Sequence, residues 1–566
     1  MCGMEQRPIS IGIENYKEII DKEYYYIDKT NFIKELLDKK GKVNVFTRPR
    51  RFGKTLALSM IKTYFEKEID LQGYVIDNSH YFAGKNILKA GEKYTAHMGE
   101  YPVISLSLKS AKQPNFQMAY DSLIDKIMVE YKRHSYILSE QVLTAEDVEK
   151  YRKILSGKAN SIACAESLKF LSDCLKTYHK KGVIILIDEY DVPLENSYFR
   201  GFYNEMIDFI RSLFESALKT NDSLEFAIIT GCLRISKESI FTGLNNLGIN
   251  SILTQNYAEY FGFTTSEVEG MLKDYNQQEK IPEAKEWYDG YLFGETEVYN
   301  PWSVINYVKT AIYNRTAFPK PYWSNTSSNS IVRSLVEKAD EDAKADIETL
   351  IQGGTIEKPI HEDITYEDVD KSQDNLWNFL FFTGYLKKMS EYQLNRCIYL
   401  ELAIPNEEVA YIYENTIRDW FREHLEQTDL TPLYKAVLEA DCETFAIQVS
   451  EQLMECISYN DYKEEYYHGF LCGLLKGCKG YRVISNRESG TGRYDIVMKY
   501  PSARGQAVIM ELKVAKTFDD LEAGCDEALR QIEERQYDTE LKKDGYRNIT
   551  KYGICFYKKE CMVKAM

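Results

Sequence analysis

Short apolar segments alternate with amphipathic ones over the first half of this chain, and this alternation limits the possible folds. Neighbouring parallel strands need a crossover of a dozen or more residues, usually a helix. Residues 1–285 therefore predict an α/β domain with a parallel sheet and helices on both faces. The predicted strands are Val43–Phe46, Val103–Leu108, Val183–Ile187 and Phe226–Thr230, and the predicted helices include Thr55–Glu66 and Ser167–Tyr178.

The chain has 566 residues, more than one hydrophobic core supports, so further domains are expected. Residues 286–370 are turn-rich and then acidic, and we interpret them as a lid or winged-helix-like region. Residues 371–455 are predicted to be a mainly helical connector. Residues 456–566 predict a second α/β domain, with strands around Val483, Ile496 and Ile509, helices over Asp519–Tyr537, and a last strand near Tyr552–Phe556.

Cysteine spacing, the N-terminal residues and the net charge predict the cellular compartment and the classes of partner. Twelve cysteines occur without a Cys-x-x-Cys pair, and Met1–Ser10 has no apolar signal core, so we expect a cytoplasmic protein with free thiols. The apolar run Val183–Ile187 is too short to span a bilayer, and no membrane partner is expected. The net charge of −16 argues against a protein that simply coats nucleic acid.

The segment Phe46–Thr55 joins a predicted strand to a predicted helix and ends in Gly53-Lys54-Thr55. In a phosphate loop, the glycine allows a tight turn, the lysine reaches the β- and γ-phosphates, and the hydroxyl binds Mg²⁺. The sequence therefore predicts an ATP and Mg²⁺ site here. The usual first glycine is replaced by Arg48, and Arg50 and Arg51 follow. These arginines either add positive charge to the phosphate cradle or obstruct it.

Two further predicted strands end in polar residues that suit the same site. Asp188 and Glu189 follow Val183–Ile187, so Asp188 is expected to join the Mg²⁺ shell and Glu189 to polarise the attacking water. Thr230 and Arg234, at the end of Phe226–Thr230 and beyond, are candidates for contacting the γ-phosphate. The alternatives are a solvated acidic turn and a surface arginine.

A second group of residues lies in the C-terminal region. Glu511 and Lys513 are two apart on one predicted strand, so they share a face, and Asp495 precedes another strand by one residue. Two carboxylates and a lysine on a sheet face can hold Mg²⁺ against a phosphodiester. The alternative is a solvated ion-pair face. Further candidates are Glu465 as an additional metal ligand, Glu488, His468 and Gln531.

Positive charge is concentrated around this second group. Residues 479–516 contain eight basic and three acidic residues, in a chain that is acidic overall. Such a patch suits nucleic acid, and binding to it would weaken as the salt concentration rises. The alternative is a basic face that docks on the protein's own acidic surface.

These motifs together resemble a bacterial family of AAA-ATPase-like proteins with a C-terminal PD-(D/E)xK nuclease domain. The resemblance implies ATP at Lys54, Thr55, Asp188 and Glu189, a restriction-endonuclease-like fold at the C-terminus, and a nuclease core of Asp495, Glu511 and Lys513. It also implies that the arginine-rich loop is usual. The strings that carry it are Ile11–Tyr16, Tyr25–Thr30, Phe46–Thr55, Ile187–Leu194, Thr230–Ser239, Tyr467–Phe470, Ser485–Gly490 and Gly492–Ile496.

Three functional hypotheses follow. In the first, ATP binding controls a metal-dependent domain that cleaves DNA or RNA. In the second, the protein is a nucleotide-switched binding or signalling module whose nuclease fold is inactive. Assembly into a homo-oligomer is a further possibility. In the third, residues 286–370 bind DNA through a winged-helix-like unit, which their acidity disfavours.

Overall fold

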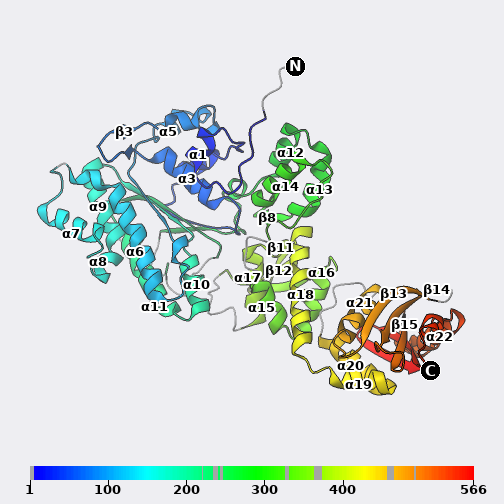
Figure 1. The fold of residues 1–566 in the computed structure, drawn as a ribbon. Helices are drawn as coiled ribbons and strands as arrows, with labels where there is room; N and C mark the ends of the chain where they lie inside the picture. Colours follow the sequence, from blue (N-terminus) through cyan, green and yellow to red (C-terminus); the bar gives the residue numbers. More distant parts are fainter. Residues whose placement is uncertain are drawn as a thin grey trace. The chain divides into compact units, whose positions relative to one another are not determined.

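The computed structural model describes residues 6–139, 141–219, 221–233, 240–241, 246–324, 330–362, 372–455, 464–489 and 492–566. Contacts divide the chain into two compact units (Figure 1). The first unit comprises Met1–Leu335 and Thr355–Ile412, and the second comprises Val336–Gly354 and Tyr413–Met566. Within the described ranges, no helix is both long and apolar enough to cross a membrane.

A five-stranded sheet forms the centre of the first unit. All its pairings are parallel, in the order β4-β5-β6-β1-β7, which confirms the predicted parallel sheet. Because the strands are parallel, their carboxyl ends share one edge. The strands are β1 (Val43–Thr47), β4 (Val103–Ser107), β5 (Val183–Asp188), β6 (Leu224–Gly231) and β7 (Leu247–Asn250).

Helices cover both faces of this sheet (Figure 1). Helix α3 (Lys54–Phe65) lies on one face, while α6 (Phe116–Arg133), α9 (Ser167–His179) and α11 (Tyr203–Phe214) lie on the other. Helices α6, α9 and α11 bury their apolar side and expose a polar side, whereas no residue of α3 is exposed. Smaller elements complete this part: α1 (Tyr16–Asp21), α2 (Asn31–Lys39), β2 (Glu68–Ile69), β3 (Val75–Ile76), α4 (Asn86–Lys89), α5 (Glu92–Thr95), α7 (Ala145–Leu155), α8 (Ser161–Ala165) and α10 (Val192–Arg200).

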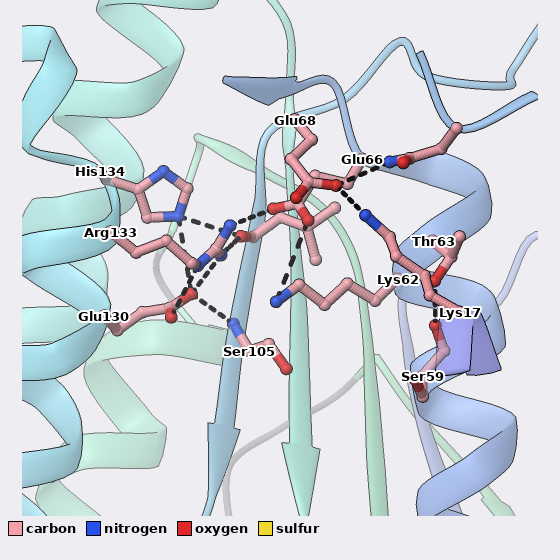
Figure 2. A network of polar contacts seen from close by, with 12 residues as sticks. Lys17, Ser59, Lys62, Thr63, Glu66, Glu68, Ser105, Glu130, Arg133 and His134 are labelled. Carbon is pink, nitrogen blue, oxygen red and sulfur yellow. Dashed lines mark hydrogen bonds and ion pairs between the residues drawn. The ribbon is translucent and has the colours of Figure 1, made fainter. Parts of the chain in front are cut away.

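A buried ionic network fixes the far end of α3 (Figure 2). Glu66, which directly follows α3, accepts a hydrogen bond from Arg133 at the end of α6. Arg133 also binds Glu130, whose carboxylate accepts the backbone N–H of Ser105 in β4 at 2.7 Å. The carboxyl end of α3 is therefore linked to both β4 and α6. The amino end of α3 belongs to the site described below.

Residues 258–313 add a small helical layer with its own core. Helices α12 (Thr265–Asp274), α13 (Ile281–Tyr288) and α14 (Pro301–Tyr313) share a cluster that includes Val268, Leu272, Tyr288, Tyr307 and Val308. The hairpin β8 (Tyr291–Phe293) and β9 (Thr296–Val298) connects α13 to α14. This layer supplies side chains to the site described below.

Residues 371–455 are mainly helical, as expected, but their first half also contains two strands that were not predicted. Strands β11 (Lys387–Leu394) and β12 (Cys397–Ala403) form an antiparallel hairpin, and β10 (Ile356–Ile360) pairs with β12. Helix α17 (Gln373–Thr383) packs on β10. Most of β11 is exposed, so its sequence lacks the alternation of apolar and polar residues that marks a half-buried strand.

The second unit is built on a mixed sheet in the order β13-β14-β15-β16-β17. Only the β15–β16 pair is parallel. The strands are β13 (Arg482–Ser489), β14 (Gly492–Lys499), β15 (Gln506–Val514), β16 (Asn548–Tyr557) and β17 (Glu560–Ala565), and the helices include α21 (Glu464–Leu475), α22 (Leu521–Glu534) and α23 (Thr539–Lys543). Strand β17 was not expected from the sequence.

The core of the second unit extends beyond the predicted boundary at residue 456. Leu433 and Val437 of α19 (Thr431–Glu439), and Phe445 and Val449 of α20 (Cys442–Glu455), belong to the same buried cluster as Tyr552 of β16. Helix α16 (Glu341–Ile351) also belongs to this unit, while α15 (Ser330–Lys338) and α18 (Glu407–Gln427) span the divisions between the units. Part of the predicted connector is therefore core.

Candidate functional site

The turn between β1 and α3 has the backbone geometry of a phosphate loop. Gly53 has φ = +82°, in the left-handed region that glycine adopts without steric cost. Helix α3 begins at the next residue, Lys54. The first N–H groups of a helix have no acceptor within the helix, and its dipole favours an anion at this end. The start of α3 can therefore receive phosphate oxygens.

Side chains from the ends of β5 and β6 and from the start of α3 meet at Asp188. The Thr55 hydroxyl donates to Asp188 Oδ2 at 2.8 Å, and the Thr230 hydroxyl donates to Asp188 Oδ1 at 2.5 Å. Because β6 lies between β1 and β5, Thr230 reaches Asp188 across the shared sheet edge. The structure thus brings together three predicted residues, and Thr230 contacts the carboxylate that is expected to hold Mg²⁺.

The ammonium group of Lys54 lies inside the loop. It donates to the carbonyl oxygens of Arg48 and Pro49, both at 2.8 Å, and Lys54 is only 6% exposed. An incoming phosphate would replace these two neutral acceptors with charged oxygens, which make stronger hydrogen bonds with an ammonium. The lysine is therefore held close to where it would act.

Glu189 follows Asp188 with an unusual backbone conformation. Its φ is +52°, which is uncommon outside glycine and is frequent at functional sites. Its side chain lines a cavity of about 400 Å³ in front of the phosphate loop. Burial raises the pKa of the Glu189 carboxyl, an effect that the Lys109 ammonium opposes. Glu189 is thus placed at the cavity as the predicted water-polarising group requires.

The three arginines of the loop have different positions. Arg48 is fully buried, and its guanidinium carbon lies 5.3 Å from the ring centre of Phe261 and 5.0 Å from that of Phe293. It donates to the carbonyl oxygens of Thr47 at 2.9 Å and Asn250 at 2.7 Å. Arg48 therefore neither joins the phosphate cradle nor obstructs it, but stabilises the loop through its contacts with neighbouring rings and carbonyl oxygens.

Arg50 and Arg51 do line the cavity. Arg50 forms an ion pair with Glu195 of α10. The Arg51 guanidinium stacks over the Trp302 ring at 4.3 Å, and Arg51 has φ = +71°. Both predicted cofactor-binding arginines are therefore within reach of a ligand in the cavity.

The rest of the cavity is largely apolar. Next to the phosphate loop, the lining includes Ile13, Ile27, Phe263, Trp302 and Ile305. Ligand pockets typically combine such a wall with a few placed polar groups. A flat aromatic base on the apolar wall and a triphosphate at the start of α3 would both be accommodated. The residues present therefore fit a nucleoside triphosphate.

The second group of residues meets on the mixed sheet. Strands β14 and β15 pair antiparallel, with Ile496 opposite Met510. The next position in this register brings Asp495 and Glu511 together. Asp495 Oδ2 accepts the backbone N–H of Leu512 at 2.8 Å, and Lys513 Nζ lies 3.6 Å from Glu511 Oε1. The predicted trio thus converges, although Asp495 lies inside β14 rather than before a strand.

Burial and mutual repulsion disfavour the charged form of the carboxyl groups of Asp495 and Glu511. Burial, followed by the charge of Asp495, raises the pKa of Glu511 to about 8. Glu511 is 2% exposed, and its Oε2 has no hydrogen-bond partner. A divalent cation would satisfy this oxygen and neutralise both carboxylates. The pair therefore fits a hard metal ion, although the described ranges contain no cluster of three or more candidate ligands.

Two comparisons with protein families agree with this geometry. Residues 10–241 match the family model for predicted AAA-ATPases, and residues 462–566 match the model for the PD-(D/E)XK nuclease superfamily. The chain joins an AAA-ATPase-like domain to a nuclease-superfamily domain. This confirms the predicted family and the order of its domains.

A curated relative extends the comparison. A protein from Azotobacter chroococcum mcd 1, described as an uncharacterized protein in the vnfD 5' region, is 26% identical over 341 residues. The match covers 59% of this chain and 57% of the relative. The chain therefore spans just over half the length of the relative that it matches.

The AAA-ATPase-like domain also contains site residues that sequence reasoning missed. Glu14, Lys109 and Lys112 line the cavity. No motif marks the two lysines, and the string Ile11–Tyr16 gave no role to Glu14. Asp191 is 3% exposed and accepts the backbone N–H groups of Cys232 at 2.7 Å and Leu233 at 3.2 Å. Asp191 thus fixes the backbone that follows β6, and its position two residues after Glu189 could have indicated that it lies near the site. Arg234 lies outside the described residues.

Further residues support the nuclease-domain pair. A ring nitrogen of His468 in α21 lies 3.0 Å from the backbone oxygen of Asp495. Gln531 in α22 donates to Glu511, so it supports the carboxylate. Glu464 contributes to the raised pKa of Glu511. The side chains of the predicted candidates Glu465 and Glu488 lie outside what the structure describes.

The basic side chains of 479–516 that the structure describes do not form one patch. Because β14 and β15 are antiparallel, Arg482, Lys499 and Arg504 lie near one end of the sheet, while Lys513 and Lys516 lie near the other. Lys499 is also paired with Asp544 at 3.2 Å. Only part of the charge that the sequence places together therefore adjoins Asp495 and Glu511.

Proposed function

We propose that the AAA-ATPase-like domain binds and hydrolyses ATP, and that its nucleotide state controls a Mg²⁺-dependent nuclease site acting on DNA or RNA. The main support is the shared carboxylate of Asp188, which accepts hydrogen bonds from Thr55 and Thr230 next to the buried Lys54. A P-loop hydroxyl and an acidic strand end are the groups that hold Mg²⁺·ATP in such domains.

The arrangement suggests a role for each group in hydrolysis. Mg²⁺, when bound with ATP, would neutralise the charge on the β- and γ-phosphates. Lys54 would bind these phosphates, and Thr55 and Asp188 would orient the bound nucleotide. Glu189 would take a proton from the attacking water as its oxygen bonds to the γ-phosphorus. The bond to the β-phosphate oxygen would break, releasing ADP and phosphate.

Replacing Lys54 by alanine is expected to weaken ATP binding at least about a hundredfold, because the substitution removes the cation that meets the phosphates. Calorimetric titration of Mg·ATP into the whole protein measures this. Lys22→Ala, which removes an exposed lysine paired with Glu18, is the control. Equal ATP affinity in wild type and Lys54→Ala, with both folded, would exclude this site.

In the nuclease domain, Asp495 and Glu511 would hold the metal ion, which supplies charge stabilisation at the phosphodiester. Lys513, 3.6 Å from Glu511, would orient the attacking water or the scissile phosphate. Lys516 adds positive charge at the same end of the sheet. Nucleic acid is thus the proposed partner of this end, rather than of the whole basic run.

Asp495→Ala is expected to lower Mg²⁺- or Mn²⁺-dependent cleavage at least about a hundredfold, because it removes one of two metal carboxylates. Plasmid, linear and single-stranded DNA and RNA, with and without ATP, are suitable substrates. Asp526→Ala, in an exposed pair with Lys564, is the matched control. Equal cleavage by Asp495→Ala would show that the activity comes from elsewhere.

A binding module with an inactive nuclease fold is the second candidate. It is favoured by the pairing of only two carboxylates, since the described ranges offer no third ligand in place. Nucleic acid that is bound in an ATP-dependent way but never cleaved would support this candidate. Cleavage that is unchanged by ATP or by Lys54→Ala would contradict nucleotide control.

A further inference from the structure

One lysine at the cavity stands between two carboxylates. Lys109 belongs to the short 3-10 helix Lys109–Ala111, which follows β4. Its ammonium nitrogen lies 2.7 Å from Glu14 Oε1 and 3.9 Å from Glu189 Oε1. The first distance is a charge-assisted hydrogen bond, while the second is too long for one. Lys109 is therefore hydrogen-bonded to Glu14 and forms a longer ion pair, without a hydrogen bond, with Glu189.

Glu14 connects this lysine to the ligand cavity. It directly follows Gly12 and Ile13, and all three residues line the cavity. The next residue, Asn15, caps α1 by accepting the backbone N–H of Lys17 at 2.9 Å. The Glu14 side chain is 48% exposed, so burial does not hold it in place. The contact that places the Glu14 side chain at the cavity is therefore its hydrogen bond with Lys109.

We propose that Lys109 is a positioning residue for Glu189, and that Glu14 holds the lysine away from it. This inference rests on the proposed ATP hydrolysis. A Glu189 oxygen bonded to an ammonium is not available to take a proton from water. When Lys109 is bonded to Glu14, the Glu189 oxygens remain free to do so. The ion pair between Lys109 and Glu14 is thereby coupled to catalysis at the γ-phosphate.

The coupling predicts a suppressor pattern in ATP turnover. In Glu14→Gln the lysine loses its charged partner, moves onto Glu189 and lowers kcat at least tenfold, while KM changes by less than threefold. Adding Lys109→Met removes the competing cation and recovers at least fivefold of the lost turnover. Adding Lys109→Arg keeps the cation, so that double variant stays slow. A structural defect would not be repaired by removing a second charge.

Steady-state phosphate release by the whole protein measures this, with Mg·ATP affinity determined by calorimetry for each variant. Glu18→Gln, which breaks the exposed pair with Lys22, is the matched control and is expected to keep wild-type turnover. Full turnover in Glu14→Gln, or no recovery in Glu14→Gln/Lys109→Met, overturns the inference alone. A wild type that binds ATP without turning it over overturns both the inference and the proposed hydrolysis.

Discussion

Replacing Arg48 by glycine, the residue usual at this position of a phosphate loop, is expected to lower the free energy of unfolding by about 2–4 kcal/mol. The substitution leaves a void between Phe261 and Phe293 and removes the donor to Asn250. Arg48 does not have a positive φ, so glycine's conformational freedom brings no compensating benefit. ATP binding is expected to weaken, because the Arg48 carbonyl that positions Lys54 becomes mobile.

Replacing Arg48 by methionine distinguishes the effect of side-chain volume on stability from the effect of side-chain charge. Arg48 is poorly compensated, since its Nε and Nη2 have no hydrogen-bond partner and burial lowers its pKa to about 9. Arg48→Met fills similar space without a buried charge and is expected to stay within about 1 kcal/mol of wild type. Denaturant unfolding and ATP titration measure both variants.

Arg51→Gly is the matched control for this series. Arg51 is exposed and has φ = +71°, so glycine relieves backbone strain there while losing only the stacking on Trp302. A net change below about 1 kcal/mol is expected. A stable Arg48→Gly protein with normal ATP affinity would contradict the supporting role of Arg48.

Glu511→Gln is expected to have opposite effects on stability and activity. Between about pH 4.5 and 8 the folded protein keeps a proton on Glu511 that the unfolded chain releases, so wild-type stability falls as pH rises through this range. A neutral amide removes this dependence and should stabilise the protein by about 2 kcal/mol above pH 8, with no gain near pH 4.

The same substitution removes a proposed metal ligand. Mn²⁺ is expected to raise the melting temperature of wild type but not of Glu511→Gln, and cleavage should fall at least about a hundredfold in the variant. Scanning calorimetry at pH 5, 7 and 9, with and without Mn²⁺, tests both statements. Glu522→Gln, an exposed carboxylate that pairs with Lys564, provides the control. A pH-independent difference between Glu511→Gln and wild type would argue against the raised pKa.

Much of the first site could be predicted from local sequence. Lys54, Thr55, Asp188 and Glu189 occur at strand and helix ends, and parallel strands bring such ends to one sheet edge. The role of Arg48 was not predictable, because it depends on Phe261, Phe293 and Asn250, which are more than 200 residues away. Glu14 and Lys109 were missed for the same reason, since tertiary packing alone makes them neighbours.

The C-terminal site was predictable in its residues but less so in its surroundings. Glu511 and Lys513 share a face because strand side chains alternate, whatever the rest of the fold does. The spread of the basic run follows from strand direction, which its sequence does not encode. The exposed strand β11 lacked an apolar pattern. Helices α19 and α20 were assigned to a connector because amphipathic helices do not reveal which sheet they cover.

The division of the chain has a consequence for dissecting the protein. Each compact unit is assembled from two separate stretches, so the polypeptide crosses between units at residues 335–336, 354–355 and 412–413. Cutting at residue 462, where the nuclease match begins, would strip Leu433, Val437, Phe445 and Val449 from the interior that contains Tyr552. A C-terminal fragment expressed alone is therefore expected to be insoluble, and its inactivity would say nothing about the intact protein.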